Sequence, residues 1–126
     1  MSKRIFLLIL LFPVVILALA GCSGGGGVVT FWQNVGDAGF SADQASGIVL
    51  AFDGSGTPYV AYRDGANSGK ATVMKFNGAT WETVGGAGFS AGEVGGASLA
   101  LDGGTPYVAY RDQANAGKAT VMKYTP

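Results

Sequence analysis

The residues best suited to directed polar chemistry occur twice in this chain, in the same order and at the same spacing. Each set holds an arginine, an aspartate, an asparagine and a lysine: Arg63, Asp64, Asn67 and Lys70, then Arg111, Asp112, Asn115 and Lys118. Arginine can hold an acidic group through two parallel hydrogen bonds, so each set is a candidate site for a sugar or an acidic ligand. The alternative is structural, because Asp and Asn cap turns and charged side chains can pair with one another.

The residue types that most enzymes use for acid-base or nucleophilic chemistry are scarce. Histidine is absent, and cysteine occurs once. The chain therefore lacks the commonest general base and the commonest transition-metal ligand. No pair of carboxylates has a spacing that indicates acid and base roles. We expect no catalytic residue, no metal and no cofactor, and a hydrolase is the least favoured function.

Composition and charge place the chain among small globular proteins. Its 126 residues are 48% hydrophobic and 13% charged, and the formal net charge is +0. A nucleic-acid-binding surface needs an excess of basic residues, and a disordered chain contains few apolar ones. We therefore expect no DNA or RNA partner, and the length allows one small domain.

The N-terminus has the pattern of an export signal. Lys3 and Arg4 precede an apolar run over residues 5–20 that ends in small residues. A helix needs about 20 apolar residues to span a bilayer, and Pro13 interrupts this run. The segment is therefore marginal as a membrane span and typical of a signal peptide.

The residues that end this segment, Leu-Ala-Gly-Cys at 19–22, resemble the lipobox of bacterial lipoproteins at every position. In that family the cysteine thiol receives a diacylglyceryl group, and a peptidase cuts before the cysteine. The resemblance implies a signal peptide over residues 1–21, lipidation at Cys22 and a Gly-rich tether over residues 22–29. It also implies a protein held in the bacterial cell envelope by two or three acyl chains. Ser23 in place of aspartate favours the outer membrane if the host is Gram-negative. A secretory peptide or a retained membrane helix is the alternative.

The rest of the chain is an internal repeat. The stretch GTPYVAYRD stands at residues 56–64 and again at 104–112. Short runs rich in Val, Tyr and Thr are separated by Gly, Asp and Asn, and no apolar pattern has a long helical period. An all-β domain is therefore expected over residues 30–126. The expected strands cover residues 47–52, 58–63, 71–76 and 80–84 in the first repeat and residues 97–101, 106–111 and 119–124 in the second.

The order of motifs in each repeat resembles bacterial β-propeller repeats of the NHL and Kelch-like kind. These motifs are an apolar strand ending in Asp, a Gly turn, PYVAYRD, ATVMK and a final Trp-x-x-Val-Gly strand. The resemblance implies two four-stranded antiparallel propeller blades. Residues 30–35 carry Trp32 and Val35, which match Trp81 and Val84. We expect residues 30–35 to form an additional strand, which brings the total to the eight strands of two blades.

Two blades cannot close a ring, because propellers contain about four to eight. A bare blade face would forfeit on the order of 10 kcal/mol of hydrophobic stabilisation. Two alternatives follow for this chain. Identical chains form a homo-oligomer, a trimer or a tetramer that closes the ring, or the chain is a fragment of a longer propeller protein with no activity of its own.

The long loops are the expected ligand-binding regions, since propellers bind at loops on one face. These loops cover residues 36–46, 64–69, 85–96 and 112–117, and they hold or adjoin both polar sets. The resemblance thus implies a membrane-anchored, non-catalytic binding module for a glycan or an envelope protein. Trp32 and Trp81 could stack on a sugar ring, although blade packing is the favoured role, as their place beside Val35 and Val84 indicates.

Overall fold

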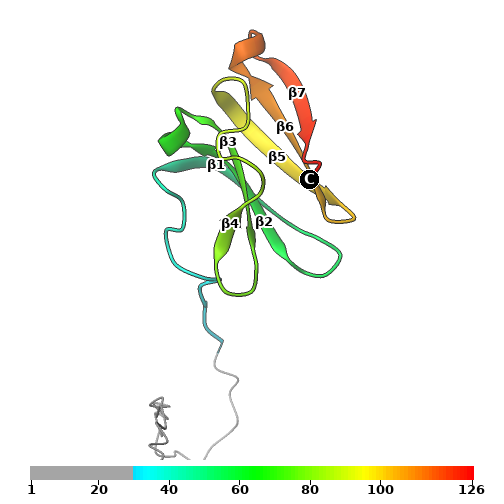
Figure 1. Cartoon of the computed structure of the whole chain (residues 1–126). Coiled ribbons are helices and arrows are strands. Elements are labelled where there is room, and N and C mark those ends of the chain that lie inside the picture. Colours follow the sequence, from blue (N-terminus) through cyan, green and yellow to red (C-terminus); the bar gives the residue numbers. More distant parts are fainter. Residues whose placement is uncertain (1–29) are drawn as a thin grey trace, which may run out of the picture. The chain divides into compact units, whose positions relative to one another are not determined.

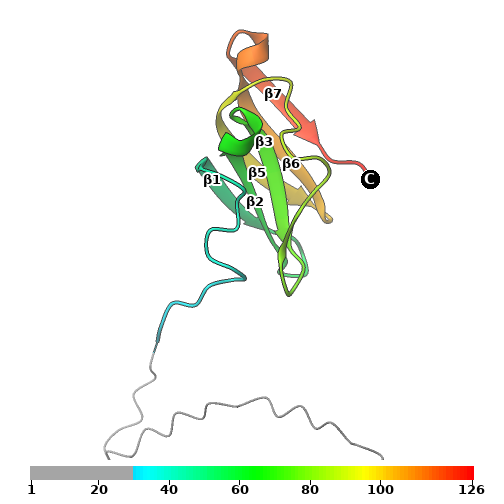
Figure 2. The same ribbon diagram turned by 60° about the vertical axis from the view of Figure 1, so that its left-hand side comes forward.

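The computed structural model describes residues 30–126, whose strands form two antiparallel sheets (Figures 1 and 2). The first sheet has the order β1-β2-β3-β4, with bounds Ala45–Phe52, Pro58–Asp64, Lys70–Phe76 and Trp81–Thr83. The second sheet has the order β5-β6-β7, with bounds Val94–Asp102, Thr105–Asp112 and Lys118–Lys123. Short 3-10 helices, η1 (Gly65–Asn67) and η2 (Gln113–Asn115), join β2 to β3 and β6 to β7. The prediction of an all-β domain is confirmed.

The hairpins form at the Asp-Gly sequences. Between β1 and β2, the Asp53 carboxylate accepts hydrogen bonds from the amides of Ser55 and Thr57, each 2.9 Å long. Between β5 and β6, Gly103 and Gly104 adopt positive φ angles of 54° and 85°. Such angles close a tight turn and favour glycine, so the turn residues fix where each strand ends.

The core lies between the two sheets. Tyr59, Ala61 and Val73 of the first sheet cluster with Val108 and Tyr110 of the second, and each is 6% exposed or less. Side chains alternate between the faces of a strand, so one face of the first sheet packs against one face of the second. Trp32–Pro126 form one compact unit on this core.

Residues 84–93, which connect β4 to β5, cover the outer edge of β3. The amides of Val84 and Phe89 donate to the carbonyl oxygens of Val73 and Ala71, at 2.8 and 2.9 Å. The Ala71 amide in turn donates to the Ser90 hydroxyl at 2.9 Å. This connection therefore pairs the polar backbone groups that β3 would otherwise leave open beyond the short strand β4.

The expected strand at residues 30–35 does not form, and the prediction of this additional strand is wrong. Its counterpart, β4, exists because it pairs with β3, where Phe76 lies opposite Trp81. Residues 30–35 contain no strand and have no pairing partner among the described residues. A strand is defined by its pairing, so an apolar sequence alone is not sufficient.

Two tyrosine hydroxyls of the middle strands each point to a methionine of the next strand. Tyr62 donates to the Met74 sulfur at 3.3 Å, and Tyr110 donates to the Met122 sulfur at 3.1 Å. The thioether is a weak acceptor, so these contacts orient the tyrosines more than they stabilise the fold.

Candidate functional site

The first polar set is organised around the carboxylate of Asp64, which caps η1 and is 1% exposed. One carboxylate oxygen accepts from the Ala66 amide at 3.0 Å. The other accepts from the Asn67 amide group at 2.8 Å and from the Thr72 hydroxyl at 2.7 Å. Burial by itself raises the pKa of Asp64, but the hydrogen bonds from Thr72, Asn67 and Ala66 outweigh it and leave the pKa below its usual value.

The second polar set repeats this arrangement around Asp112, which caps η2. Its carboxylate accepts from the Asn115 amide group at 2.7 Å, from Thr120 at 2.9 Å and from the Ala114 amide at 3.0 Å. The hydrogen bond from Asn115 is the largest influence, and together with those from Thr120 and the backbone it holds the pKa of Asp112 below its usual value against desolvation. Both carboxylates therefore stay ionised while they fix their loops.

The structure thus brings together the aspartate and the asparagine of each set in a structural role. Asp64 binds Asn67 and Asp112 binds Asn115, which is the capping alternative that the sequence left open. These hydrogen bonds occupy the carboxylate oxygens with groups of the same loop. A ligand role for these four residues stays a prediction.

The two lysines are the first residues of β3 and β7, and their side chains make no hydrogen bond to Asp64 or Asp112 among the described residues. Lys70 is half-buried and Lys118 is exposed. Neither makes an ion pair with a residue that the structure describes. They remain available to an anionic group that approaches the loops.

The arginines differ more than their shared sequence suggests. Arg63 forms an ion pair with Glu93 of the second repeat, across the junction of the two sheets. Arg111 forms none with a residue in the described range. Both guanidinium groups lie against a glycine: a Cβ atom at Gly69 or Gly117 would stand 2.9 Å from the arginine Nε atom. A side chain at either glycine would therefore displace the guanidinium group.

A polar pocket of about 330 Å³ lies beside Arg63. It is lined by Gln44, Ser46, Arg63, Gly65, Ser68 and Gly69. The Arg63 Nε atom is buried and has no hydrogen-bond partner among the described residues. An unpaired buried donor is a cost to the folded chain, and Gly69 lies against this atom.

This pocket joins two of the loops that the sequence assigned to one face. The Gly65 amide donates to the Gln44 carbonyl at 2.9 Å, which ties residues 36–46 to η1. Sequence reasoning named the loops but missed Gln44, Ser46 and Ser68 as lining residues. The signal that could have found them is their position, since Gln44 and Ser46 immediately flank the start of β1.

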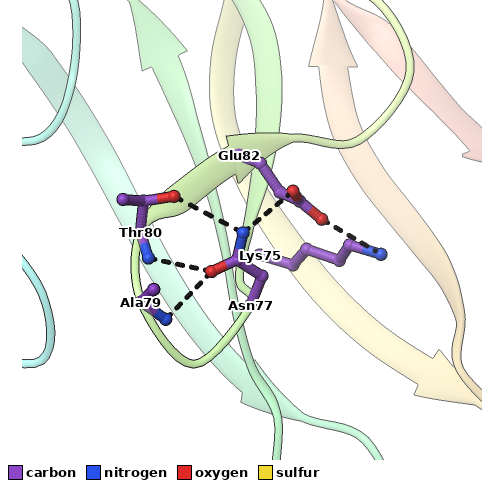
Figure 3. A network of polar contacts seen from close by, with 5 residues as sticks. All are labelled: Lys75, Asn77, Ala79, Thr80 and Glu82. Atoms are coloured by element: carbon purple, nitrogen blue, oxygen red, sulfur yellow. Dashed lines mark hydrogen bonds and ion pairs between the residues drawn. The ribbon is translucent and has the colours of Figure 1, made fainter. Parts of the chain in front are cut away.

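A second polar region lies at the opposite end of the first sheet, around the loop between β3 and β4 (Figure 3). The Asn77 side chain accepts from the amides of Ala79 and Thr80 at 2.9 and 2.8 Å and donates to Glu82 at 3.2 Å. Glu82 also lies 3.4 Å from the Lys75 ammonium group. These contacts close the loop on itself, so they hold a turn rather than a ligand.

Trp81 packs within the chain. Its ring stacks on Phe40 with 4.3 Å between centroids, and its Nε1 atom donates to the Val35 carbonyl at 2.7 Å. Trp32, in contrast, is 102% exposed. The packing role expected for both tryptophans thus holds for Trp81 within the described residues.

The residues expected to anchor the protein lie outside the described range. Cys22, the signal peptide over residues 1–21 and the tether over residues 22–29 all precede residue 30. In the described part of the chain, no helix has the length and apolar character needed to cross a membrane. The same part holds no group of three or more side chains able to ligate a metal.

Comparisons with protein-family models, with curated proteins and with solved structures found no match for this chain.

Proposed function

We propose that this chain is a lipid-anchored protein of the bacterial cell envelope whose β domain is a non-catalytic binding module. The module consists of two propeller-type blades and binds a polar ligand, a glycan or an envelope protein, at its loops. Support for the blades comes from the first sheet, whose four antiparallel strands follow one another in sequence order, as the strands of a blade do.

The observation that carries the binding role is the pocket beside Arg63. It is lined by Arg63, Gln44, Ser46 and Ser68, whose side chains carry guanidinium, amide and hydroxyl groups. These are donors and acceptors of the kind that bind sugar hydroxyls or a uronic-acid carboxylate. The capped loop η1 holds one wall of the pocket in place before a ligand arrives, which lowers the entropy lost on binding.

The anchor is proposed from the lipobox resemblance at residues 19–22. Attachment through Cys22 would place the module a short tether away from the membrane surface. Growth with a labelled fatty acid tests this directly: we expect label in the wild-type protein and none in Cys22→Ser. Labelling that persists in Cys22→Ser would contradict lipidation at this residue.

The binding role is tested with a glycan array and with capture of partners from envelope extract. For any ligand found, Arg63→Gln should weaken binding about tenfold or more, because it removes a charged hydrogen-bond donor from the pocket. Lys75→Gln is the matched control, since it removes an exposed cation at the other end of the same sheet. Equal affinity of wild type and Arg63→Gln, with both folded by circular dichroism, would overturn the proposal.

A further inference from the structure

The contact between the two sheets joins unlike faces. The front face of each sheet is defined here by Leu50, Phe52 and Val60 in the first repeat and by their counterparts Leu99, Leu101 and Val108 in the second. The back face is defined by Tyr59, Ala61 and Val73 and by their counterparts Tyr107, Ala109 and Val121. In the core, the back of the first sheet packs on the front of the second.

This arrangement leaves exposed the back face of the second sheet and the β1 part of the front face of the first sheet, whereas Val60 on that front face is 6% exposed. On the front of the first sheet, Ile48, Leu50 and Phe52 are 61%, 59% and 59% exposed. On the back of the second sheet, Val121 is 65% exposed, whereas its counterpart Val73 is 3% exposed. Most residues of these two faces match those of the two faces that already pack together, but Ser98 on the exposed back stands where Val49 packs against the core.

The edges show the same complementarity. In the first sheet, β4 pairs with β3, placing Trp81 opposite Phe76, Glu82 opposite Lys75 and Thr83 opposite Met74. In the second sheet, β7 has no strand at its outer edge among the described residues, and in both views it lies on the side away from the first sheet (Figures 1 and 2). The segment that matches β4 is Trp32-Gln33-Asn34, which is unpaired within the described chain.

Residues 35–40 lie beside the uncovered front face and form a groove with it. The groove has a volume of about 430 Å³, and its apolar lining includes Val35, Phe40, Ile48, Leu50, Phe52 and Val60. At the corresponding place in the second repeat, Val84, Phe89 and Val108 surround a pocket of about 150 Å³ that Val73 of the first sheet also lines. The larger groove therefore corresponds to the smaller pocket, but no valine from the back face of another sheet lines it.

The exposed large apolar side chains of the described residues gather on these two surfaces. The N-terminal surface, formed by residues 32–40 and the front of the first sheet, carries Trp32, Val35, Ile48, Leu50 and Phe52. The C-terminal surface, formed by the back of the second sheet and the β7 edge, carries Val121 on the back, and Met122 and Tyr124 on the front side of that edge are 38% and 40% exposed. Phe31, the remaining one, directly precedes Trp32 in the chain. Apolar clusters of this kind mark interaction sites.

We propose that the partner of both surfaces is a second copy of this chain, docked head to tail. The N-terminal surface of one copy covers the C-terminal surface of the next, and the contact repeats the one that already joins the two sheets within each chain. Because the two surfaces differ, the contact is heterologous, so copies add in one direction until a ring closes or a filament grows.

The repeat specifies the contacts of this interface. Val84 and Phe89 donate their amides to Val73 and Ala71 within the chain, so Val35 and Phe40 of one copy donate to the counterparts of those two residues in the next copy. Those counterparts are Val121 and Ala119. Trp32 pairs beside Tyr124 and stacks on Phe89 of the next copy, as Trp81 does beside Phe76 and on Phe40.

Paired cysteines test the register of this interface. Asn34 and Met122 are the counterparts of Thr83 and Met74, which lie opposite each other in the first sheet. Opposed residues on antiparallel strands have a Cα separation within the range that a disulfide spans. The full-length chain with Cys22→Ser, purified in detergent, carries Asn34→Cys, Met122→Cys or both.

On oxidation, we expect a ladder of disulfide-linked multimers from the double variant. Either single variant alone, whose like cysteines do not meet in a head-to-tail contact, should stay uncrosslinked, whereas mixing the two should give a linked dimer. A double variant that remains monomeric, or single variants that crosslink as readily as the double one, would overturn the proposed register.

Light scattering tests the assembly itself on the full-length chain in detergent, without relying on a designed disulfide. We expect the wild type to be oligomeric, and Leu50→Arg and Val121→Arg each to raise the dissociation constant about tenfold or more, because each places a charge in the apolar contact. Ser55→Arg, in the exposed turn between β1 and β2 and outside the residues that define either surface, is the matched control. Leu50 and Val121 are exposed in the single chain, so both variants should keep the wild-type circular dichroism. A folded, monomeric wild type would refute self-association, and an oligomer that neither substitution weakens would show that copies meet elsewhere.

Discussion

Strands β3 and β7 share the six residues KATVMK, yet only β3 is enclosed. In β3, Ala71, Thr72 and Val73 are exposed by 0%, 1% and 3%. In β7 the counterparts Ala119 and Val121 are exposed, and Thr120 is half-buried. The difference arises from what covers the strand, because residues 81–93 and the second sheet lie over β3 while β7 has neither in the described chain. The same side chains are thus core in one repeat and surface in the other.

The largest effect should come from placing a charge at the matched valines. Val73→Asp buries a carboxylate in the core and should lower the free energy of unfolding by about 3 kcal/mol or more. Val121→Asp places the same carboxylate in solvent and should change it by less than about 0.5 kcal/mol in the dissociated chain. Urea denaturation at a protein concentration where light scattering gives a monomer measures both. Equal losses would mean that the two strands are equally enclosed.

Acid should destabilise both loops, and the direction follows from the carboxylates that cap them. The pKa values of Asp64 and Asp112 are lower in the folded chain than in the unfolded one, so folded carboxylates bind protons less readily. Their contribution is complete above the unfolded pKa of about 4 and is lost as the pH falls through the lower folded values. Thermal melts between neutral pH and about pH 2 should show this loss. In Asp64→Asn/Asp112→Asn, which should be less stable at neutral pH, the acid-dependent part should shrink. An unchanged acid dependence in the double variant would assign the effect to other carboxylates.

The next difference concerns the threonines that bind these carboxylates. Thr72 donates to Asp64 and accepts from the Gly88 amide at 2.9 Å, whereas Thr120 has only Asp112 as a partner among the described residues. Thr72→Val should cost about 2 kcal/mol because it removes two hydrogen bonds, and Thr120→Val should cost about 1 kcal/mol because it removes one. Chemical denaturation compares them, and a larger loss for Thr120→Val would reverse the comparison.

The smallest expected effect concerns the ion pair that links the repeats. Glu93 pairs with Arg63, but its counterpart in the first repeat is Gln44, so Arg111 would meet a neutral side chain across the proposed contact between copies. Gln44→Glu should strengthen association by about 0.5 kcal/mol, a few-fold in the dissociation constant, and should do so less at high salt. Gln44→Lys should weaken it. Sedimentation at two salt concentrations measures the change, and identical behaviour of the two variants would place Gln44 outside the contact.

The sequence predicted the features that each repeat sets locally. Alternating apolar residues and Asp-Gly turns gave the strands close to their observed bounds, and the Asp-x-x-Asn spacing allowed the capping role of Asp64 and Asp112. The prediction of a strand at residues 30–35 was wrong, because a strand forms only beside a partner strand, and the sequence pattern does not show whether such a partner is adjacent. The pocket beside Arg63 was missed in part for the same reason, since Gln44 and Ser68 meet only through the fold.

The tyrosine–methionine contacts carry a chemical consequence. Thioethers oxidise to sulfoxides at a rate that follows their exposure. Met122 is 38% exposed at the β7 edge, whereas Met74 is half-buried in β3, where it lies opposite Thr83 of β4. On exposure to peroxide, the chain should therefore acquire a sulfoxide at Met122 before Met74. A neighbouring copy that covers β7 would shield that sulfur. The fraction of Met122 oxidised to the sulfoxide would therefore increase with the time that the chain spends dissociated.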